Sequence, residues 1–187
     1  MVEDRSGLVA YPCVKKLLRH SLSVGLAGLR SGLPITWKAK MLSKQQRYRG
    51  ALLGLACGDA VGTTLEFAQR GTFTPITDMV GGGPFHLELG QWTDDTSMAL
   101  CLAASLVHCR GFDAADQMDR YSQWRRNGYM SSNGRCFDIG GTVYDALRQY
   151  EKTGEPFSGA TDPQSAGNGS LMRLVPVVMF YHPDKEA

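Results

Sequence analysis

The chain has 187 residues, 43% of them hydrophobic and 20% charged, a composition typical of one soluble globular domain with or without a tail. It has no run of 18 apolar residues, so we expect no membrane-spanning helix. Residues 1–49 hold ten Lys and Arg against two acidic residues, whereas residues 50–187 hold ten against sixteen. The net charge of +2 therefore hides an acidic body, which disfavours nucleic acid as the partner of the folded part.

Residues 1–46 are predicted to be a poorly organised basic extension, and residues 47–187 to be the folded domain. The charge of the extension lies too late for a signal peptide, and Glu3 and Asp4 disfavour a transit peptide. Met41 stands just before the first predicted helix, so we interpret residues 1–40 as an upstream extension.

The five cysteines are odd in number and form no Cys-x-x-Cys pair. This usage indicates free thiols in a reducing compartment and disfavours a disulfide framework or a zinc site. We therefore expect a cytoplasmic protein. The cysteines are Cys13, Cys57, Cys101, Cys109 and Cys136.

The first predicted helix runs from Lys44 to Val61 and carries glycines four residues apart, which lie along one side of a helix. Each costs about 1 kcal/mol of helix stability relative to alanine, so we expect a compensating close approach of another helix or of a ligand. Asp59 on the same helix is either a structural carboxylate or part of a site. The four glycines are Gly50, Gly54, Gly58 and Gly62.

Glu66 begins a long loop, Phe67 to Trp92, which is too rich in Gly and Pro for a long regular element. The loop leads to Thr93-Asp94-Asp95, whose oxygen atoms suit a hard divalent cation such as Mg²⁺ or Mn²⁺. Adjacent carboxylates repel each other, which raises a pKa unless a cation or a donor offsets the charge. The alternative is structural: Thr93 is a good N-cap, and two acidic residues in a first turn favour the helix dipole.

Further helices are predicted from Thr96 to His108, from a cap at Asp113 to Arg126, and from residues 137–142 to a glycine stop at Gly154. Asp138 is either an N-cap or a polar contact in a site. No alternating pattern predicts a strand, so the fold is predicted to be all-α with five or six helices.

The last informative stretch, residues 165–173, is a glycine-rich turn that we expect to lead into a helix start. Such a turn exposes backbone N–H groups suited to phosphate, although an ordinary turn capped by Ser170 is the alternative. An apolar helix from Leu174 to Tyr181 follows, with Pro176 near its first turn.

Together these stretches resemble the ADP-ribosylglycohydrolase family, the group of the dinitrogenase-reductase-activating glycohydrolases and ADP-ribosylarginine hydrolases. The resemblance spans about residues 47–181 and rests on five motifs in the family's order. They are residues 49–62 with Glu66, residues 81–85, residues 90–96, residues 135–140 and residues 167–173.

The resemblance implies a compact all-α bundle that cleaves the N-glycosidic bond between ADP-ribose and a protein side chain, typically arginine. It implies two Mg²⁺ or Mn²⁺ ions, with Thr93, Asp94 and Asp95 among their ligands. Asp94 and Asp95 are then also catalytic, and Glu66 is a candidate general base or cation stabiliser. The residues implied to hold the ribose and pyrophosphate are Asp138, Gly140, Gly167, Asn168, Gly169, Ser170, Met172 and Arg173.

The chain also departs from the family pattern, because no second metal-ligand motif of the form Asp-x-Asp follows Asp95. We therefore expect the N-terminal part of such a domain, with an incomplete metal site. An apolar face that includes Val175, Val177, Met179 and Phe180 is then expected to be exposed. Three interpretations stay open: a hydrolase acting on ADP-ribosylated protein, an inactive homologue that binds ADP-ribose or a partner, and a non-functional fragment.

Overall fold

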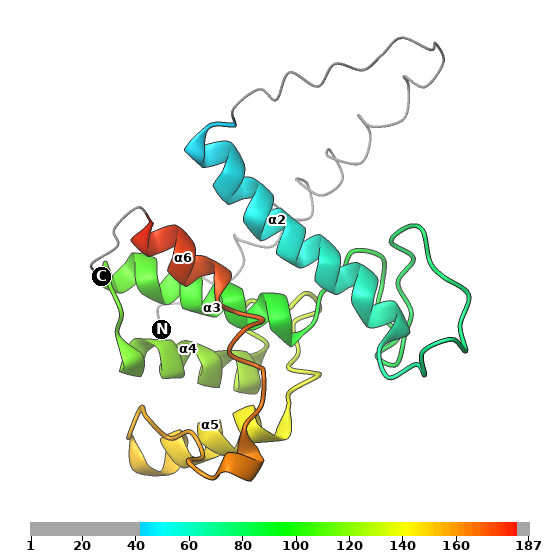
Figure 1. Cartoon of the computed structure of the whole chain (residues 1–187). Helices are drawn as coiled ribbons and strands as arrows, with labels where there is room; N and C mark the ends of the chain where they lie inside the picture. Colours follow the sequence, from blue (N-terminus) through cyan, green and yellow to red (C-terminus); the bar gives the residue numbers. More distant parts are fainter. Residues whose placement is uncertain (1–41, 183–187) are drawn as a thin grey trace, which may run out of the picture. The chain divides into compact units, whose positions relative to one another are not determined.

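The computed structural model describes residues 42–182, which are helical apart from turns, loops and one isolated bridge. The chain divides into two units, residues 1–46 and 47–187. Our interpretation of residues 1–40 lies outside the described residues and stays a prediction. Within the described part the α-helices are α2 (Lys44–Gly62), α3 (Asp94–Cys109), α4 (Ala114–Asn127), α5 (Gly141–Thr153) and α6 (Val175–Tyr181), as labelled in Figure 1. The all-α prediction is confirmed.

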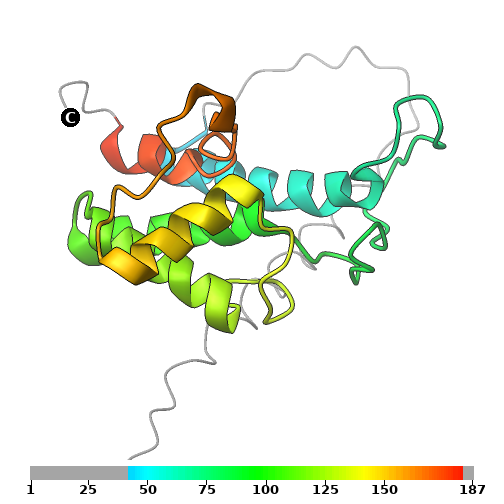
Figure 2. The ribbon, with the colours of Figure 1, turned by 90° about the horizontal axis from the view of Figure 1, so that it is seen from below.

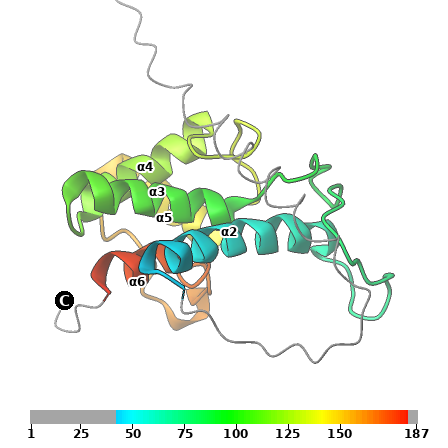
Figure 3. The same ribbon diagram turned by 90° about the horizontal axis from the view of Figure 1, so that it is seen from above.

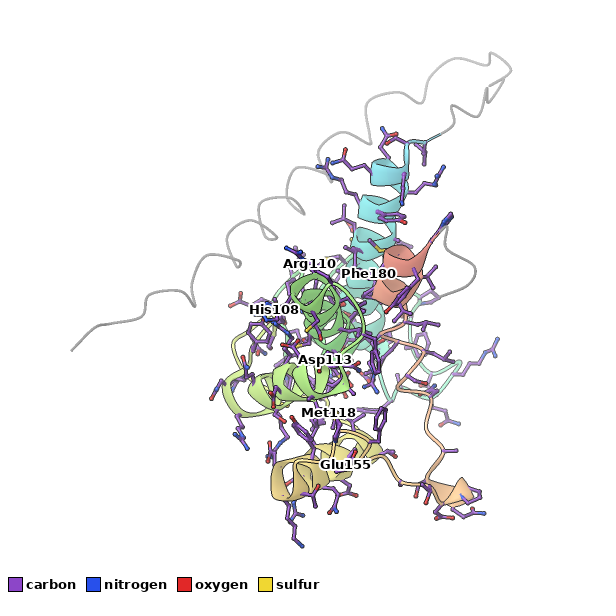
Figure 4. The ribbon with its side chains drawn as sticks, turned by 90° about the vertical axis from the view of Figure 1, so that its left-hand side faces the viewer. His108, Arg110, Asp113, Met118, Glu155 and Phe180 are labelled. Atoms are coloured by element: carbon purple, nitrogen blue, oxygen red, sulfur yellow. The ribbon has the colours of Figure 1, made fainter. Side chains whose placement is uncertain are left out.

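Helix ends follow from local chemistry that the sequence displays. The side chain of Asp113 accepts a hydrogen bond from the backbone N–H of Asp116 and caps α4, as predicted. Gly154 ends α5 in the left-handed conformation, which glycine adopts without steric cost. Pro176 lies in the first turn of α6. Figure 4 shows His108, Arg110 and Asp113 at the turn from α3 to α4.

The hydrophobic core of the second unit forms around α3, which packs against both α4 and α6, while α4 also packs against α5. Figure 1 shows α3, α4 and α5 one below another, and in Figure 2, seen from below, α5 (yellow) lies in front of α3 and α4 (green). Burial of each large apolar side chain stabilises the fold by about 1.5–3 kcal/mol. The buried core residues are Met98, Cys101, Leu102, Leu106, Tyr121, Trp124 and Leu147.

Helix α2 buries little, since Ala56 and Ala60 are its only buried residues. It runs past the N-terminal end of α3 (Figure 3). A Cβ added at any glycine of the four-residue series would meet no heavy atom within 4 Å. The expected close approach of another helix is therefore wrong for the described residues, and the ligand alternative remains for the glycines at the C-terminal end of α2.

The segment between α2 and α3 starts with a short 3₁₀-helix, η1 (Thr63–Leu65), and then forms an irregular loop, as predicted. The loop is closed on itself by an isolated bridge, in which Gly82 and Leu87 exchange backbone hydrogen bonds of 2.8 and 2.9 Å. At Gly83 a Cβ would lie 2.5 Å from the carbonyl oxygen of Thr63, so only glycine fits there. The loop is thereby fastened against the end of α2.

Helix α6 exposes part of the apolar face expected from the sequence. Phe180 is exposed, whereas Val175, Val177 and Met179 are half-buried, because α6 packs against α3. The expected exposure is therefore confirmed for Phe180 and holds only in part for the other three residues. No helix in residues 42–182 is long and apolar enough to cross a membrane.

Candidate active site

A cavity of about 500 Å³ lies where the end of α2, the start of α3, the start of α5 and a glycine-rich loop meet. Most of the candidate residues predicted from the sequence line it, although they lie far apart along the chain, from Glu66 to Met172. The predicted residues in its wall are Glu66, Thr93, Asp94, Asp95, Asp138, Gly140, Gly167, Asn168, Gly169 and Met172. Ser170 and Arg173 are not among the lining residues.

Thr93 occupies the N-cap position of α3, and Asp94 and Asp95 form its first turn. The structural alternative predicted a local cap, but the Thr93 side chain makes no capping hydrogen bond to its own helix. That part of the prediction is wrong. Its Oγ1 instead donates a hydrogen bond of 2.9 Å to Oδ1 of Asp59 on α2.

Asp59 accepts hydrogen bonds from both the backbone and the side chain of two residues at the start of α3. The backbone N–H groups of Thr93 and Thr96 lie 3.0 and 3.1 Å from its carboxylate oxygens. The Thr96 hydroxyl donates to Oδ2 at 2.6 Å. Asp59 is therefore structural and also part of the cavity wall, so the two alternatives left open by the sequence both apply.

Glu66 and Asp138 bring two further carboxyl groups to the cavity. Thr63 donates a hydrogen bond of 3.3 Å to Oε2 of Glu66. Asp138 has a φ of 58°, and Gly140 rather than Asp138 is the N-cap of α5. The N-cap interpretation of Asp138 is therefore wrong, and its alternative as a polar contact in a site remains.

Burial and neighbouring carboxylates raise the pKa values of three acidic residues in this cavity. Burial is the largest cause at Asp94, followed by the charges of Asp138, Asp95 and Asp59, and together they raise its pKa to about 8. The pKa of Asp138 is raised to about 7 by burial and then by the charge of Glu66 and a hydrogen bond with it. Burial and the charges of Asp59 and Glu66 also raise the pKa of Asp95.

No Lys, Arg or His is found among the described residues that line the cavity, whereas five carboxylates are. This uncompensated negative charge would be relieved by a bound cation. The donor atoms are all oxygen, which suits Mg²⁺ or Mn²⁺ by type. Across residues 42–182, however, no three His, Cys, Asp or Glu side chains are grouped closely enough to hold a metal ion. The donor chemistry fits such an ion, and a complete ligand set is not preassembled in this part of the chain.

The glycine-rich loop lies against the first turn of α5. A Cβ on Gly167 would be 3.7 Å from the Thr142 hydroxyl, and one on Gly169 would be 3.7 Å from a methyl group of Val143. The turn at residues 169–173 leads into α6, which begins at Val175, one residue after the predicted Leu174. The glycines line the cavity, and the phosphate site expected at this loop stays a prediction.

Sequence reasoning missed Thr63, Gly141, Thr142 and Val143, which also line the cavity. The three from α5 follow Asp138 and Gly140 at once, so the predicted start of a helix at residues 137–142 was the signal that could have found them. Thr63 carried no such signal, because its place depends on how the chain turns after α2.

A family model described as ADP-ribosylglycohydrolase matches residues 40–187. The chain is 52% identical over 132 residues to the ADP-ribosylarginine hydrolase Tri1 of Serratia proteamaculans (strain 568), a match that covers 71% of this chain and 36% of that protein. It is 37% identical over 144 residues to the ADP-ribosyl-(dinitrogen reductase) glycohydrolase of Rhodospirillum rubrum, covering 73% and 45%.

The fold is similar to that of a solved structure entitled "ADP-ribosylglycohydrolase-related protein complex". The TM-score is 0.62 and the sequence identity 49%, and the match covers 75% of this chain and 45% of that one. The chain thus spans between 36% and 45% of the length of these relatives.

Proposed function

The chain belongs to the ADP-ribosylglycohydrolase family, and on that premise we propose that it hydrolyses the N-glycosidic bond between ADP-ribose and an arginine side chain of a protein. The choice of arginine is supported by the Tri1 relative, which is named as an ADP-ribosylarginine hydrolase. The observation that carries the proposal is one cavity in which Thr93-Asp94-Asp95 faces the glycine-rich loop and the start of α5.

The cavity has two chemically different sides for an ADP-ribose group. Backbone N–H groups at Gly140, Gly141, Gly167 and Gly169 are suited to the pyrophosphate, since such groups bind anions without a basic side chain. The carboxylates lie at the ends of α2 and α3 and at Asp138, where they would stabilise positive charge developing on the ribose. Glycoside hydrolysis passes through such an oxocarbenium-like state.

We further propose that Thr93, Asp94 and Asp95 hold Mg²⁺ or Mn²⁺, with two ions expected from the family resemblance. When bound, such an ion orients ribose hydroxyls and lowers the pKa of a water molecule. The Thr93 hydroxyl is suited to this role because its proton is directed to Asp59, which leaves its lone pairs available as ligands.

Glu66 is proposed as the general base. It lies in the cavity wall beside Asp138 and is held by the Thr63 hydroxyl at 3.3 Å. From this position it can take a proton from a water that attacks the anomeric carbon, while the carbon–nitrogen bond breaks and the cationic guanidino group leaves as neutral guanidine with the bonding electron pair. A cytoplasmic location remains our proposal too, and it is supported by the free thiols of Cys57, Cys101, Cys109 and Cys136.

The test is release of free ADP-ribose from ADP-ribosylated arginine by the 187-residue chain, with Mn²⁺ or Mg²⁺ and again with EDTA. We expect metal-dependent release that Asp94→Asn abolishes and Asp145→Asn leaves unchanged. Asp145 is a matched control, because it is an exposed aspartate of α5 outside the cavity wall.

Absence of release from a cooperatively folded sample under either metal would contradict hydrolysis. Saturable ADP-ribose binding in that sample would instead support the alternative function, a homologue that binds ADP-ribose without turnover. Calorimetry with ADP-ribose on the same variants separates these two outcomes.

A further inference from the structure

We propose that Asp59 is a positioning residue: it replaces the missing local cap of α3 and orients the Thr93 hydroxyl so that its lone pairs face the cavity. The inference rests on the proposed function in one respect, that the Thr93 hydroxyl is a metal ligand. The hydrogen bonds of Asp59 to Thr93 and Thr96 are features of the fold and do not depend on that role.

The start of α3 needs partners for its backbone N–H groups, since the first turn of any helix leaves them without intrahelical acceptors. Thr93 and Thr96 are only 4% and 3% exposed, so water does not reach them readily. Their N–H groups are instead satisfied by the carboxylate of Asp59, 34 and 37 residues earlier in the chain. A negative charge at this position also favours the helix dipole.

This arrangement changes what the Thr93 side chain can do. In a local N-cap its oxygen would accept a hydrogen bond from an N–H group of its own helix and lose a lone pair to it. Here the hydroxyl donates to Asp59, and both lone pairs stay available on a side chain that lines the cavity.

The position of Asp59 on α2 is fixed from both sides. Ala56 and Ala60, the buried residues of α2, flank it in sequence, and Gly58 lines the same cavity. On the side of α3, the Ser97 hydroxyl donates to the Thr93 carbonyl oxygen at 2.7 Å, which holds the same turn from within the helix. The first turn of α3 is thus held by two hydrogen bonds from Ser97 to the Thr93 carbonyl oxygen, the second from the Ser97 backbone N–H at 3.2 Å, and by the Asp59 carboxylate from outside.

Asp59→Asn tests the inference because it keeps the side-chain volume but replaces one acceptor oxygen with an NH₂ group. That group cannot accept from the Thr93 or Thr96 donors and can itself donate to a hydroxyl. We expect faster amide hydrogen exchange at Thr93 and Thr96 with unchanged exchange in α4 and α5. Asp145→Asn should alter neither set of amides.

The second readout is the affinity for Mn²⁺ alone, measured by electron paramagnetic resonance in a double-mutant cycle with Thr93→Val. Residues that orient a metal ligand typically change metal affinity by about 10–100-fold. We expect each single variant to weaken Mn²⁺ binding by about tenfold and the double variant to add little more, because Asp59 acts through the Thr93 hydroxyl.

Fully additive losses, or unchanged exchange at Thr93 and Thr96 in Asp59→Asn, would overturn the inference. So would a uniform rise in exchange throughout the second unit, since this would mean a general loss of stability. If the wild-type protein does not bind Mn²⁺, the role of Asp59 in orienting a metal ligand is overturned. Hydrolysis is judged separately. Wild-type protein that binds Mn²⁺ but releases no ADP-ribose would contradict the proposed function, and the double-mutant cycle of Mn²⁺ affinity would still decide the role of Asp59.

Discussion

The guanidinium group of Arg173 lies over the ring of Tyr121, with its central carbon 5.1 Å from the ring centroid. Its Nη1 is also 3.4 Å from the sulfur of Met98. Tyr121 and Met98 are core residues, so Arg173 fastens the end of the glycine-rich loop to the core. Its predicted contact with substrate stays a prediction, and the direction of the side chain does not support it.

Replacement of Arg173 by methionine should lower the free energy of unfolding by about 0.5–2 kcal/mol, because the cation–π contact is lost while an apolar chain of similar length remains. Arg70→Met in the exposed loop is the control and should have no effect. Urea unfolding measures both. Equal stability of the two variants would show that the contact with Tyr121 contributes nothing.

Gly128 and Gly154 both end helices in the left-handed conformation, with φ of 66° and 73°. A Cβ on Gly128 would lie 2.1 Å from the carbonyl oxygen of Gly134, whereas one on Gly154 would meet nothing within 4 Å. Gly154→Ala should therefore lower the free energy of unfolding by the backbone strain alone, about 1–2 kcal/mol. Gly128→Ala should lower it clearly more, because the loop after α4 must move. Chemical denaturation of the two variants side by side decides this, and similar costs would refute the steric argument.

Gly50 and Gly58 form a second matched pair, since both lie inside α2 and an added Cβ on either meets no atom within 4 Å. Alanine at each position should stabilise the helix by about 0.5–1 kcal/mol. Only Gly58 lines the cavity, so only Gly58→Ala should weaken ADP-ribose binding in calorimetry. An equal loss of binding in both variants would disprove a local role for Gly58.

The ion pair between Asp116 and Arg120, with 2.6 Å between the charged atoms, predicts a pH dependence of stability. The hydrogen bond from Arg120 holds the pKa of Asp116 below its usual range, against an opposing effect of burial. The unfolded state thus takes up this proton at higher pH than the folded state. The contribution of the ion pair to the free energy of unfolding is fully present above the unfolded-state pKa of about 3.9. It is lost as the pH falls through the lower folded-state pKa.

Asp116→Asn should therefore lower the free energy of unfolding by about 0.3–1 kcal/mol near pH 7, a range suited to a partly exposed pair. The cost should be smaller at about pH 3, below the unfolded-state pKa, because the stabilisation by the ion pair is lost as the pH falls towards the folded-state value. Urea unfolding at both pH values measures the difference, with Asp145→Asn as the control. A cost that does not change with pH would rule out the ion pair as its source.

Much of the fold could be predicted because helix ends depend on residues within one turn of each other. The cap at Asp113, the stop at Gly154 and Pro176 in a first turn all follow from local backbone chemistry. Thr93, Asp94 and Asp95 were recognised as candidates for the same reason, since they are adjacent and open a helix.

Tertiary structure decided which of these groups meet and in which orientation. The sequence left two roles open for Asp59, and the position of the C-terminal end of α2 next to the start of α3 brought it to donors 34 and 37 residues away. The turn of Arg173 towards Tyr121 depends equally on a distant contact. Local sequence fixes which residues begin and end a helix, because the relevant groups are close along the chain. The direction of a side chain at a junction depends on which surfaces the helices bury together.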